Sequence, residues 1–242
     1  MDVRLETPTN LVERAGEFAA EYREKGIVRI PGFLPAAAAE ALYFHLRERP
    51  DWLQVVNYGD KLAELSREVR QTMSEAQRLD LDRAVYAAAR EGFQYRYEAI
   101  RVPDELARRK AGGDPLGSFV EFMTNSAASG FISAVLGDDS ASFADGQATA
   151  YSPGDFLTGH DDDVEGKGRV AAYVMSLTPT WRVEWGGLLL MHRDPSGYVE
   201  GHCPAFNTIT IFRVPVMHSV SEVTRSAPYR RMSITGWLRN SS

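Results

Sequence analysis

Apolar residues in the first half of the chain recur at helical spacing. Between Thr9 and Glu24 they fall at Leu11, Val12, Ala15, Phe18 and Ala19, which predicts a helix. A second helix is predicted from Pro35, because proline is favoured in the first turn. The other predicted elements of this half are a strand at residues 26–30, a strand at Trp52–Asn57, two or more helices within Lys61–Tyr97 with a break near Asp80, and a helix at Phe119–Leu136.

The pattern changes at Ser142, after which short β-branched or aromatic runs alternate with Gly, Pro, Asp and Asn. Such short, evenly spaced strands are typical of a sandwich or barrel. We therefore expect an α+β fold with a mainly β core, in which a helix-rich part (residues 1–141) supports a β-unit (142–242) within a single domain. The predicted strands are Gln147–Tyr151, Phe156–His160, Arg169–Leu177, Gly187–His192, Tyr198–His202, Thr208–Phe212, His218–Val223 and Arg231–Leu238.

Composition narrows the functional classes. The chain has 242 residues and a formal net charge of −6, which disfavours binding to the phosphate backbone of nucleic acids. A single cysteine, Cys203, excludes an intrachain disulfide and a CxxC metal site. The N-terminal residues lack the pattern of a signal peptide, and no apolar run approaches the ~20 residues of a membrane span. These features favour a cytoplasmic protein that does not bind membranes.

Five histidines provide candidate metal ligands. His160 and Asp162 are two residues apart, so in a strand both side chains would lie on one face and Asp161 on the other. With a second histidine, they would form the two-histidine, one-carboxylate set that suits Fe(II). His218 is the best candidate and His202 competes with it. His45 is expected to pack in the core and His192 to lie at the surface.

The segment His160–Asp162 alone also fits a surface histidine beside an acidic turn, or a Ca²⁺ site with oxygen ligands. A longer set of residues, in order, resembles the Fe(II)/2-oxoglutarate-dependent oxygenases, specifically their prolyl-hydroxylase-like branch. It covers about the last 95 residues. The matching residues are 150–162 (AYSPGDFLTGHDD), Arg169–Leu177, Trp181, Trp185–Leu188, Pro204, Asn207, Phe212, His218–Val220 and Arg231–Trp237.

The resemblance implies a double-stranded β-helix (jelly-roll, cupin-like) with N-terminal supporting helices. It assigns His160, Asp162 and His218 to iron, and Arg231 to the distal carboxylate of 2-oxoglutarate. A guanidinium can hold that carboxylate through two parallel hydrogen bonds. Two further residues would border the cosubstrate: Ser233, on the face of Arg231, and the aromatic Tyr151. One position departs from the family, because Ser176 stands where many animal relatives have a second tyrosine. Tyr173 is nearby but out of phase, and its side chain should face away.

The activity implied is hydroxylation of an unactivated C–H bond with Fe(II), 2-oxoglutarate and O₂, releasing succinate and CO₂. The substrate would be a prolyl residue in a protein or peptide, or alternatively a free amino acid or other small metabolite. A non-catalytic Fe/2-oxoglutarate sensor and a 2-oxoglutarate-independent cupin-type enzyme remain as further alternatives. An unpaired sheet edge would support a homodimer, although no pattern specifies one. The roles left open are those of Asp161 and Asp163 (cation or substrate contact, or a solvated turn), Trp181 and Trp185 (substrate entrance or core), and Phe93–Tyr97 (a pocket wall).

Overall fold

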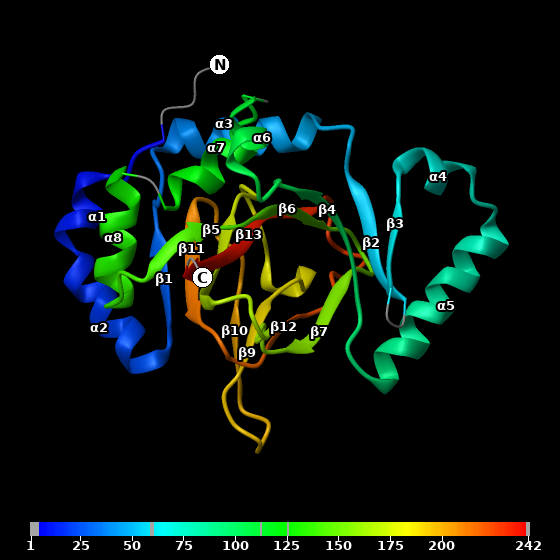
Figure 1. Cartoon of the computed structure of the whole chain (residues 1–242). Coiled ribbons are helices and arrows are strands. Elements are labelled where there is room, and N and C mark those ends of the chain that lie inside the picture. The colour runs from blue at the N-terminus through cyan, green and yellow to red at the C-terminus, as the bar shows by residue number, and fades with distance from the viewer. Residues whose placement is uncertain (1–4, 59–60, 112, 125, 241–242) are drawn as a thin grey trace.

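A computed structural model describes residues 5–58, 61–111, 113–124 and 126–240. Within them, antiparallel strands form one strongly curved sheet, with helices gathered outside it (Figure 1). The strands are β1 (Ile27–Pro31), β2 (Leu53–Tyr58), β3 (Lys61–Leu65), β4 (Tyr95–Arg101), β5 (Ala141–Ala144), β6 (Gln147–Tyr151), β7 (Phe156–His160), β8 (Arg169–Ser176), β9 (Leu189–His192), β10 (Val199–His202), β11 (Thr208–Arg213), β12 (His218–Val220) and β13 (Arg231–Asn240).

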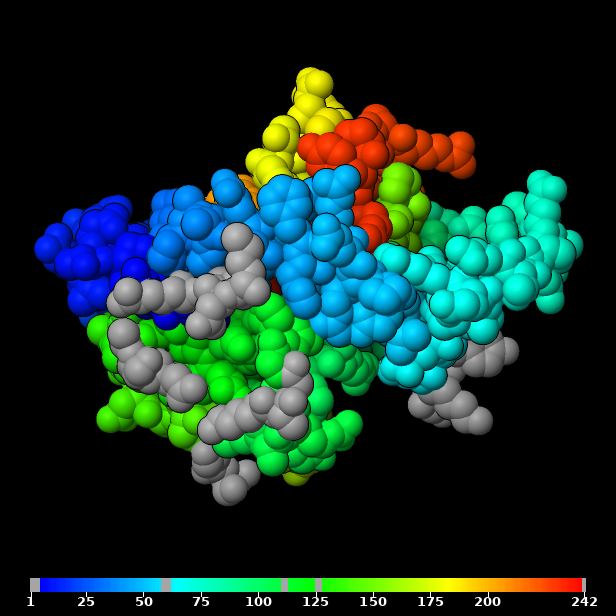
Figure 2. Space-filling model, turned by 90° about the horizontal axis from the view of Figure 1, so that it is seen from above, coloured from blue at the N-terminus to red at the C-terminus, as the bar shows by residue number. Residues whose placement is uncertain are grey.

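The helices cover the sheet from both ends and from above. In Figures 1 and 2, α1, α2 and α8 lie at one end, α4 and α5 project at the other, and α3 crosses between them. Their bounds are α1 (Thr9–Glu13), α2 (Ala15–Lys25), α3 (Ala36–Glu48), α4 (Arg67–Thr72), α5 (Glu75–Glu91), α6 (Leu106–Ala111), α7 (Pro115–Phe122) and α8 (Ser126–Leu136), with a 3₁₀ turn at Val183–Trp185. No helix of the described residues is long and apolar enough to cross a membrane.

Two four-strand leaflets make up the centre of the sheet. The order β11–β8–β13–β6 forms one leaflet and β7–β12–β9–β10 the other, and β4 pairs with both β6 and β7 and so joins them. This is the connectivity of a double-stranded β-helix, and the predicted fold class is confirmed. The residues between the leaflets therefore come from strands far apart in the sequence.

In the leaflet β11–β8–β13–β6, successive side chains of a strand point alternately to the core and to the cavity. On β8, Tyr173 and Met175 belong to the hydrophobic core beneath the helices, and the Tyr173 ring lies 6.4 Å from that of Phe119 in α7. The intervening residues, Ala172 and Val174, line the cavity between the leaflets. A strand with period 2 can do both because successive side chains leave opposite faces.

The N-terminal half contributes more strand than its pattern predicts. The eight predicted strands are present with small shifts of their ends, but β3, β4 and β5 were not expected. β3 and β4 replace the ends of the predicted helical segment Lys61–Tyr97. The predicted break near Asp80 is wrong, because α5 runs through it from a capping box of Ser74 and Gln77.

Three smaller expectations also differ. The first helix is interrupted at Arg14, which separates α1 from α2. The predicted helix Phe119–Leu136 is two helices, α7 and α8. His45 is not a core residue, because its side chain is 30% exposed and its Nε2 lies 2.9 Å from Asp114 Oδ1. That carboxylate also caps α7 by accepting from the backbone N–H of Leu116.

Candidate active site

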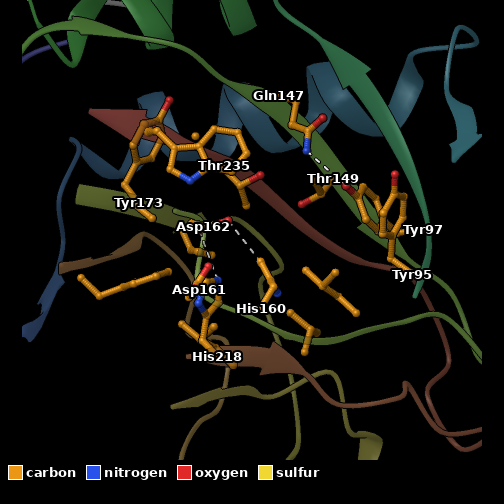
Figure 3. A pocket seen from close by; sticks show the side chains of 18 of the residues that line it. Tyr95, Tyr97, Gln147, Thr149, His160, Asp161, Asp162, Tyr173, His218 and Thr235 are labelled. Carbon is orange, nitrogen blue, oxygen red and sulfur yellow. Dashed lines mark hydrogen bonds and ion pairs between the residues drawn. The ribbon is translucent and has the colours of Figure 1, made fainter. Parts of the chain in front are cut away.

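His160, Asp162 and His218 meet in the cavity between the leaflets (Figure 3). His160 ends β7, His218 begins β12, and the two residues are paired across these strands. His160 Nε2 lies 3.3 Å from Asp162 Oδ1, and His218 Nε2 lies 3.4 Å from Asp162 Oδ2. The three ligand atoms lie within 4.8 Å of one another, and they form the one such group found in the described part of the chain.

Backbone carbonyls fix the tautomer of both histidines. His160 Nδ1 lies 3.0 Å from the carbonyl oxygen of Thr158, and His218 Nδ1 lies 2.8 Å from that of Val216. A carbonyl accepts only, so each Nδ1 must carry the proton and donate it. Each Nε2 is then a lone pair that faces the Asp162 carboxylate. Three acceptors directed at one another need a cation between them, and therefore the set fits a divalent metal ion.

Protonation of the site agrees with this assignment. Burial, together with the nearby His160, lowers the pKa of His218 to about 4 against the opposing effect of Asp162. Burial opposes ionisation of Asp162, but His160 and His218 hold the pKa of this carboxyl below its usual value. Near neutral pH the site therefore offers a neutral imidazole at His218 and a charged carboxylate, which are the forms that bind metal.

Asp162 does not reach the metal site by strand alternation. The strand ends at His160, and Asp162 has a left-handed backbone with φ of 64°. The prediction that a regular strand would place the pair on one face is therefore wrong in its reason, although the two side chains do converge. Arg169 Nη1 donates to the Asp162 carbonyl at 2.8 Å, and the Arg169 guanidinium carbon lies 3.6 Å from the ring centroid of Trp237. This arginine holds the turn that presents the ligand.

Arg231 lines the same cavity. It is 2% exposed, and among the described residues no carboxylate forms an ion pair with it. Its Nε has no hydrogen-bond partner, and burial lowers the pKa of the guanidinium below its usual range. A buried arginine without an anion is costly, and therefore the site requires an anionic ligand. A carboxylate would supply the matching charge and geometry.

The other predicted cosubstrate residues lie around Arg231. Tyr151 is paired with it across β6 and β13, and the guanidinium carbon lies 5.2 Å from the Tyr151 ring centroid. Ser233 is buried on the same face, and its hydroxyl also has no partner. Ser176 is paired with Ser233, whereas Tyr173 points to the helices and donates its hydroxyl to the Asp145 carbonyl. Tyr173 is out of phase with this row, but it still borders the cavity, so the expectation that it faces away holds only in part.

The cavity has a volume of about 510 Å³, within the ~300–1,000 Å³ range of small-molecule sites. Sequence reasoning found Phe93, Tyr95 and Tyr97 as part of its wall, and these three do line it. It missed four polar or aromatic residues of β6 and β13 that occupy the same inward phase as Tyr151 and Arg231, and strand alternation could have found them. They are Gln147, Thr149, Thr235 and Trp237.

Several other candidates lie elsewhere. His202 is not near the triad; its Nε2 lies 3.4 Å from Glu200. His192 is partly buried and its Nε2 lies 2.9 Å from the hydroxyl oxygen of Ser219. Trp181 and Trp185 are not among the lining residues of the cavity. They pack edge-to-face on each other at 5.4 Å and on Tyr229, so packing is their observed role.

Comparison with known proteins shows which family this arrangement is similar to. Residues 146–239, which include the triad and Arg231, match the family model of the 2OG-Fe(II) oxygenase superfamily. Over these residues, the chain is similar to 2OG-Fe(II) oxygenases. The resemblance seen in the sequence is thus confirmed, and similarity to this family implies Fe(II), 2-oxoglutarate and O₂ as cofactors. The acceptor triad fits the metal, and the unpaired Arg231 fits a carboxylate of 2-oxoglutarate.

Relatives of the oxygenase domain include prolyl hydroxylases. The chain is 36% identical over 115 residues to prolyl 3-hydroxylase OGFOD1 of Mus musculus, a match that covers 45% of this chain and 21% of that protein. This chain thus spans about a fifth of the length of the curated relative that it matches.

Two solved structures share the fold. The prolyl-4-hydroxylase of Pseudomonas putida is 17% identical with a TM-score of 0.61, over 94% of this chain and 100% of the other. A prolyl hydroxylase of Trichoplax adhaerens, in complex with a peptide fragment of hypoxia inducible factor, is 15% identical with a TM-score of 0.61, over 96% and 91%.

Proposed function

We propose that this protein is an Fe(II)- and 2-oxoglutarate-dependent dioxygenase that hydroxylates a prolyl residue in a protein or peptide. The main observation that supports this proposal is that one cavity contains both an acceptor triad that needs a cation and a buried arginine that needs an anion. Fe(II) together with 2-oxoglutarate would provide the cation and the anion.

Each residue of the site has a defined role in this proposal. His160, Asp162 and His218 would hold the metal through Nε2, a carboxylate oxygen and Nε2. Arg231 binds the distal carboxylate of 2-oxoglutarate, Ser233 adds a hydroxyl donor, and Tyr151 borders the cosubstrate. When bound, Fe(II), 2-oxoglutarate and O₂ supply the oxidant for the C–H bond, with release of succinate and CO₂.

The protein contributes position and shielding. Leu157, Leu189, Phe212 and Val220 line the cavity with apolar groups and limit the access of water to the reacting centre. The choice of a prolyl substrate is supported by the relatives, which are prolyl hydroxylases, one of them in complex with a peptide. A protein or peptide substrate is favoured over a free metabolite on this ground.

The test is turnover with proline-containing peptides. The protein is incubated with Fe(II), 2-oxoglutarate and air, succinate is measured by NMR, and the peptides are measured by mass spectrometry. We expect succinate and a peptide gain of one oxygen atom, both lost in His218→Ala and both retained in the matched histidine variant His45→Ala. Succinate formation with free amino acids but not with peptides would contradict the substrate assignment. The absence of succinate with any substrate would contradict the proposal as a whole.

A further inference from the structure

The cavity wall beside the metal ligands carries an aromatic pair, Phe93 and Tyr95. Tyr95 is the first residue of β4, and Phe93 lies two residues before it in the segment that follows α5. Their ring centroids lie 5.5 Å apart, and the Phe93 ring lies 5.4 Å from that of His160. Figure 3 shows Tyr95 and Tyr97 side by side along β4, on the side of the cavity where His160 lies. We call Phe93 and Tyr95 the aromatic face.

The backbone holds this face in place. Asn57 Nδ2 donates to the Phe93 carbonyl at 2.9 Å. The backbone N–H of Gln94 donates to the Thr158 hydroxyl at 2.8 Å, and the Thr158 N–H donates to the Gln94 carbonyl at 2.9 Å. Thr158 is two residues before the ligand His160. The aromatic face and the metal ligand are therefore fixed to the same short segment of backbone.

Phe93 is 48% exposed although it borders a buried metal site. Burial of a phenylalanine side chain is stabilising, so an exposed ring at this position leaves stabilisation unused. Single exposed apolar residues are common. Phe93 differs because its surface continues into the cavity through Tyr95, Leu157 and Val220. An apolar group lying on this face would be close to the metal ligand His160.

The chemistry of the face selects its occupant. Phe93, Tyr95 and Leu157 are uncharged, and a free amino acid would bring its ammonium and carboxylate groups against them. A prolyl residue within a peptide has an apolar ring and neutral amides, and aromatic grooves bind proline-rich chains in this way. The ring faces carry negative electrostatic potential, which suits the C–H groups beside the prolyl nitrogen.

We propose that Phe93 and Tyr95 bind the ring of the target prolyl residue in a peptide and place it beside the metal. This inference rests on the proposed function and adds residues that set specificity. Loss of the Phe93 ring should weaken binding of a prolyl peptide by about 3–10-fold, as expected for an aromatic contact of ~0.5–1.5 kcal/mol. The binding of 2-oxoglutarate, which depends on Arg231, should remain.

The experiment uses the full chain loaded with Zn(II), which has no redox chemistry, and with 2-oxoglutarate. The probe is the blocked peptide acetyl-Ala-Ala-Pro-Ala-Ala-amide, and saturation-transfer NMR reports contact with its prolyl ring protons. We expect saturation of the ring protons with the wild type and with Phe93→Tyr, and reduced saturation with Phe93→Ala and Phe93→Leu. Phe44→Ala is the matched control, because Phe44 is 52% exposed on α3 away from the cavity.

The same samples separate this inference from the proposed function. Thermal stabilisation by 2-oxoglutarate should be equal in the wild type and Phe93→Ala. If the wild type is not stabilised by 2-oxoglutarate, the proposed function fails. If it is stabilised but the prolyl protons are not saturated, or are saturated equally in Phe93→Ala, the aromatic face is not the binding site. Loss of stabilisation by 2-oxoglutarate in Phe93→Ala would show a merely structural role and also overturn the inference.

Discussion

Replacement of Arg231 by methionine should raise the stability of the ligand-free protein. The guanidinium is 2% exposed, and no carboxylate of the described residues is paired with it. Exchanging a buried charge for an apolar side chain of similar volume is often stabilising, by ~1–4 kcal/mol. At ~2–4 °C per kcal/mol for a chain of this size, the melting temperature should rise by several degrees.

The same substitution should abolish tight binding of 2-oxoglutarate. Two charge-assisted hydrogen bonds of ~1.5–3 kcal/mol each would be lost, which corresponds to ~10²- to 10⁴-fold in Kd. At a 2-oxoglutarate concentration of ~100 Kd the wild type gains ~2.7 kcal/mol, and the variant should gain almost nothing. Arg231→Lys keeps the charge but not the bidentate geometry, and should be intermediate.

Thermal unfolding with Zn(II), with and without 2-oxoglutarate, measures both effects. Arg230→Met is the matched control, since the Arg230 guanidinium pairs with Glu98 at 2.5 Å. It should lower stability slightly and leave the 2-oxoglutarate shift intact. If ligand-free Arg231→Met were less stable than the wild type and still responded to 2-oxoglutarate, the role of Arg231 as an uncompensated buried charge would be refuted.

Three other variants test the surroundings of the site. The pKa of His218 is about 4 in the folded protein and about 6.5 in an unfolded chain. The free energy of unfolding of the metal-free protein should therefore fall by up to about 3 kcal/mol as the pH falls from ~6.5 to ~4. Chemical unfolding of His218→Gln should show a flatter pH dependence. Arg169→Met should weaken Co(II) binding ~10-fold by calorimetry, because the Asp162 carbonyl loses its donor, and unchanged affinity would argue against this positioning role. Gly187→Ala should be destabilised by ~1–2 kcal/mol in urea, because φ is 62° and the new Cβ would lie 3.1 Å from Arg231 Cδ; wild-type stability would contradict this.

The β-strands of the second half were predictable because their signals are local. β6 and β7 begin and end where the sequence predicts, with Ser152–Asp155 as the turn between them. Asp155 accepts from the Ser152 N–H at 2.8 Å, and Gly154 has φ of 90°, a conformation that glycine adopts without strain. Short-range turn chemistry of this kind can be read from a few neighbouring residues.

The strands β3 and β4 and the Asp162 turn depend on distant partners. β4 is a strand because β2, β6 and β7 all pair with it. The Asp162 backbone is held by Arg169, which in turn lies on Trp237 in the last strand. Such contacts join residues remote in sequence, and the hydrophobic pattern of a single segment does not record them.

The roles of the triad and of Arg231 came from the family resemblance, and the structure adds their spatial relation. Alternation predicted that Arg231 and Ser233 share a face, and they do lie in one inward row with Thr235. It did not predict that Arg231 lacks an anionic partner or that both ligand histidines have their Nδ1 occupied. Those facts require the three-dimensional neighbours of each polar atom.

Joint binding of Fe(II) and 2-oxoglutarate in the cavity is tested by an anaerobic titration of the protein with both, followed by visible absorbance. We predict a charge-transfer band that requires both additions, disappears in His160→Ala, and needs much more 2-oxoglutarate in Arg231→Met. His45→Ala should behave as the wild type. A folded protein that binds Fe(II) but shows no band with 2-oxoglutarate would contradict the assignment of the site and favour a metal enzyme that does not use this cosubstrate.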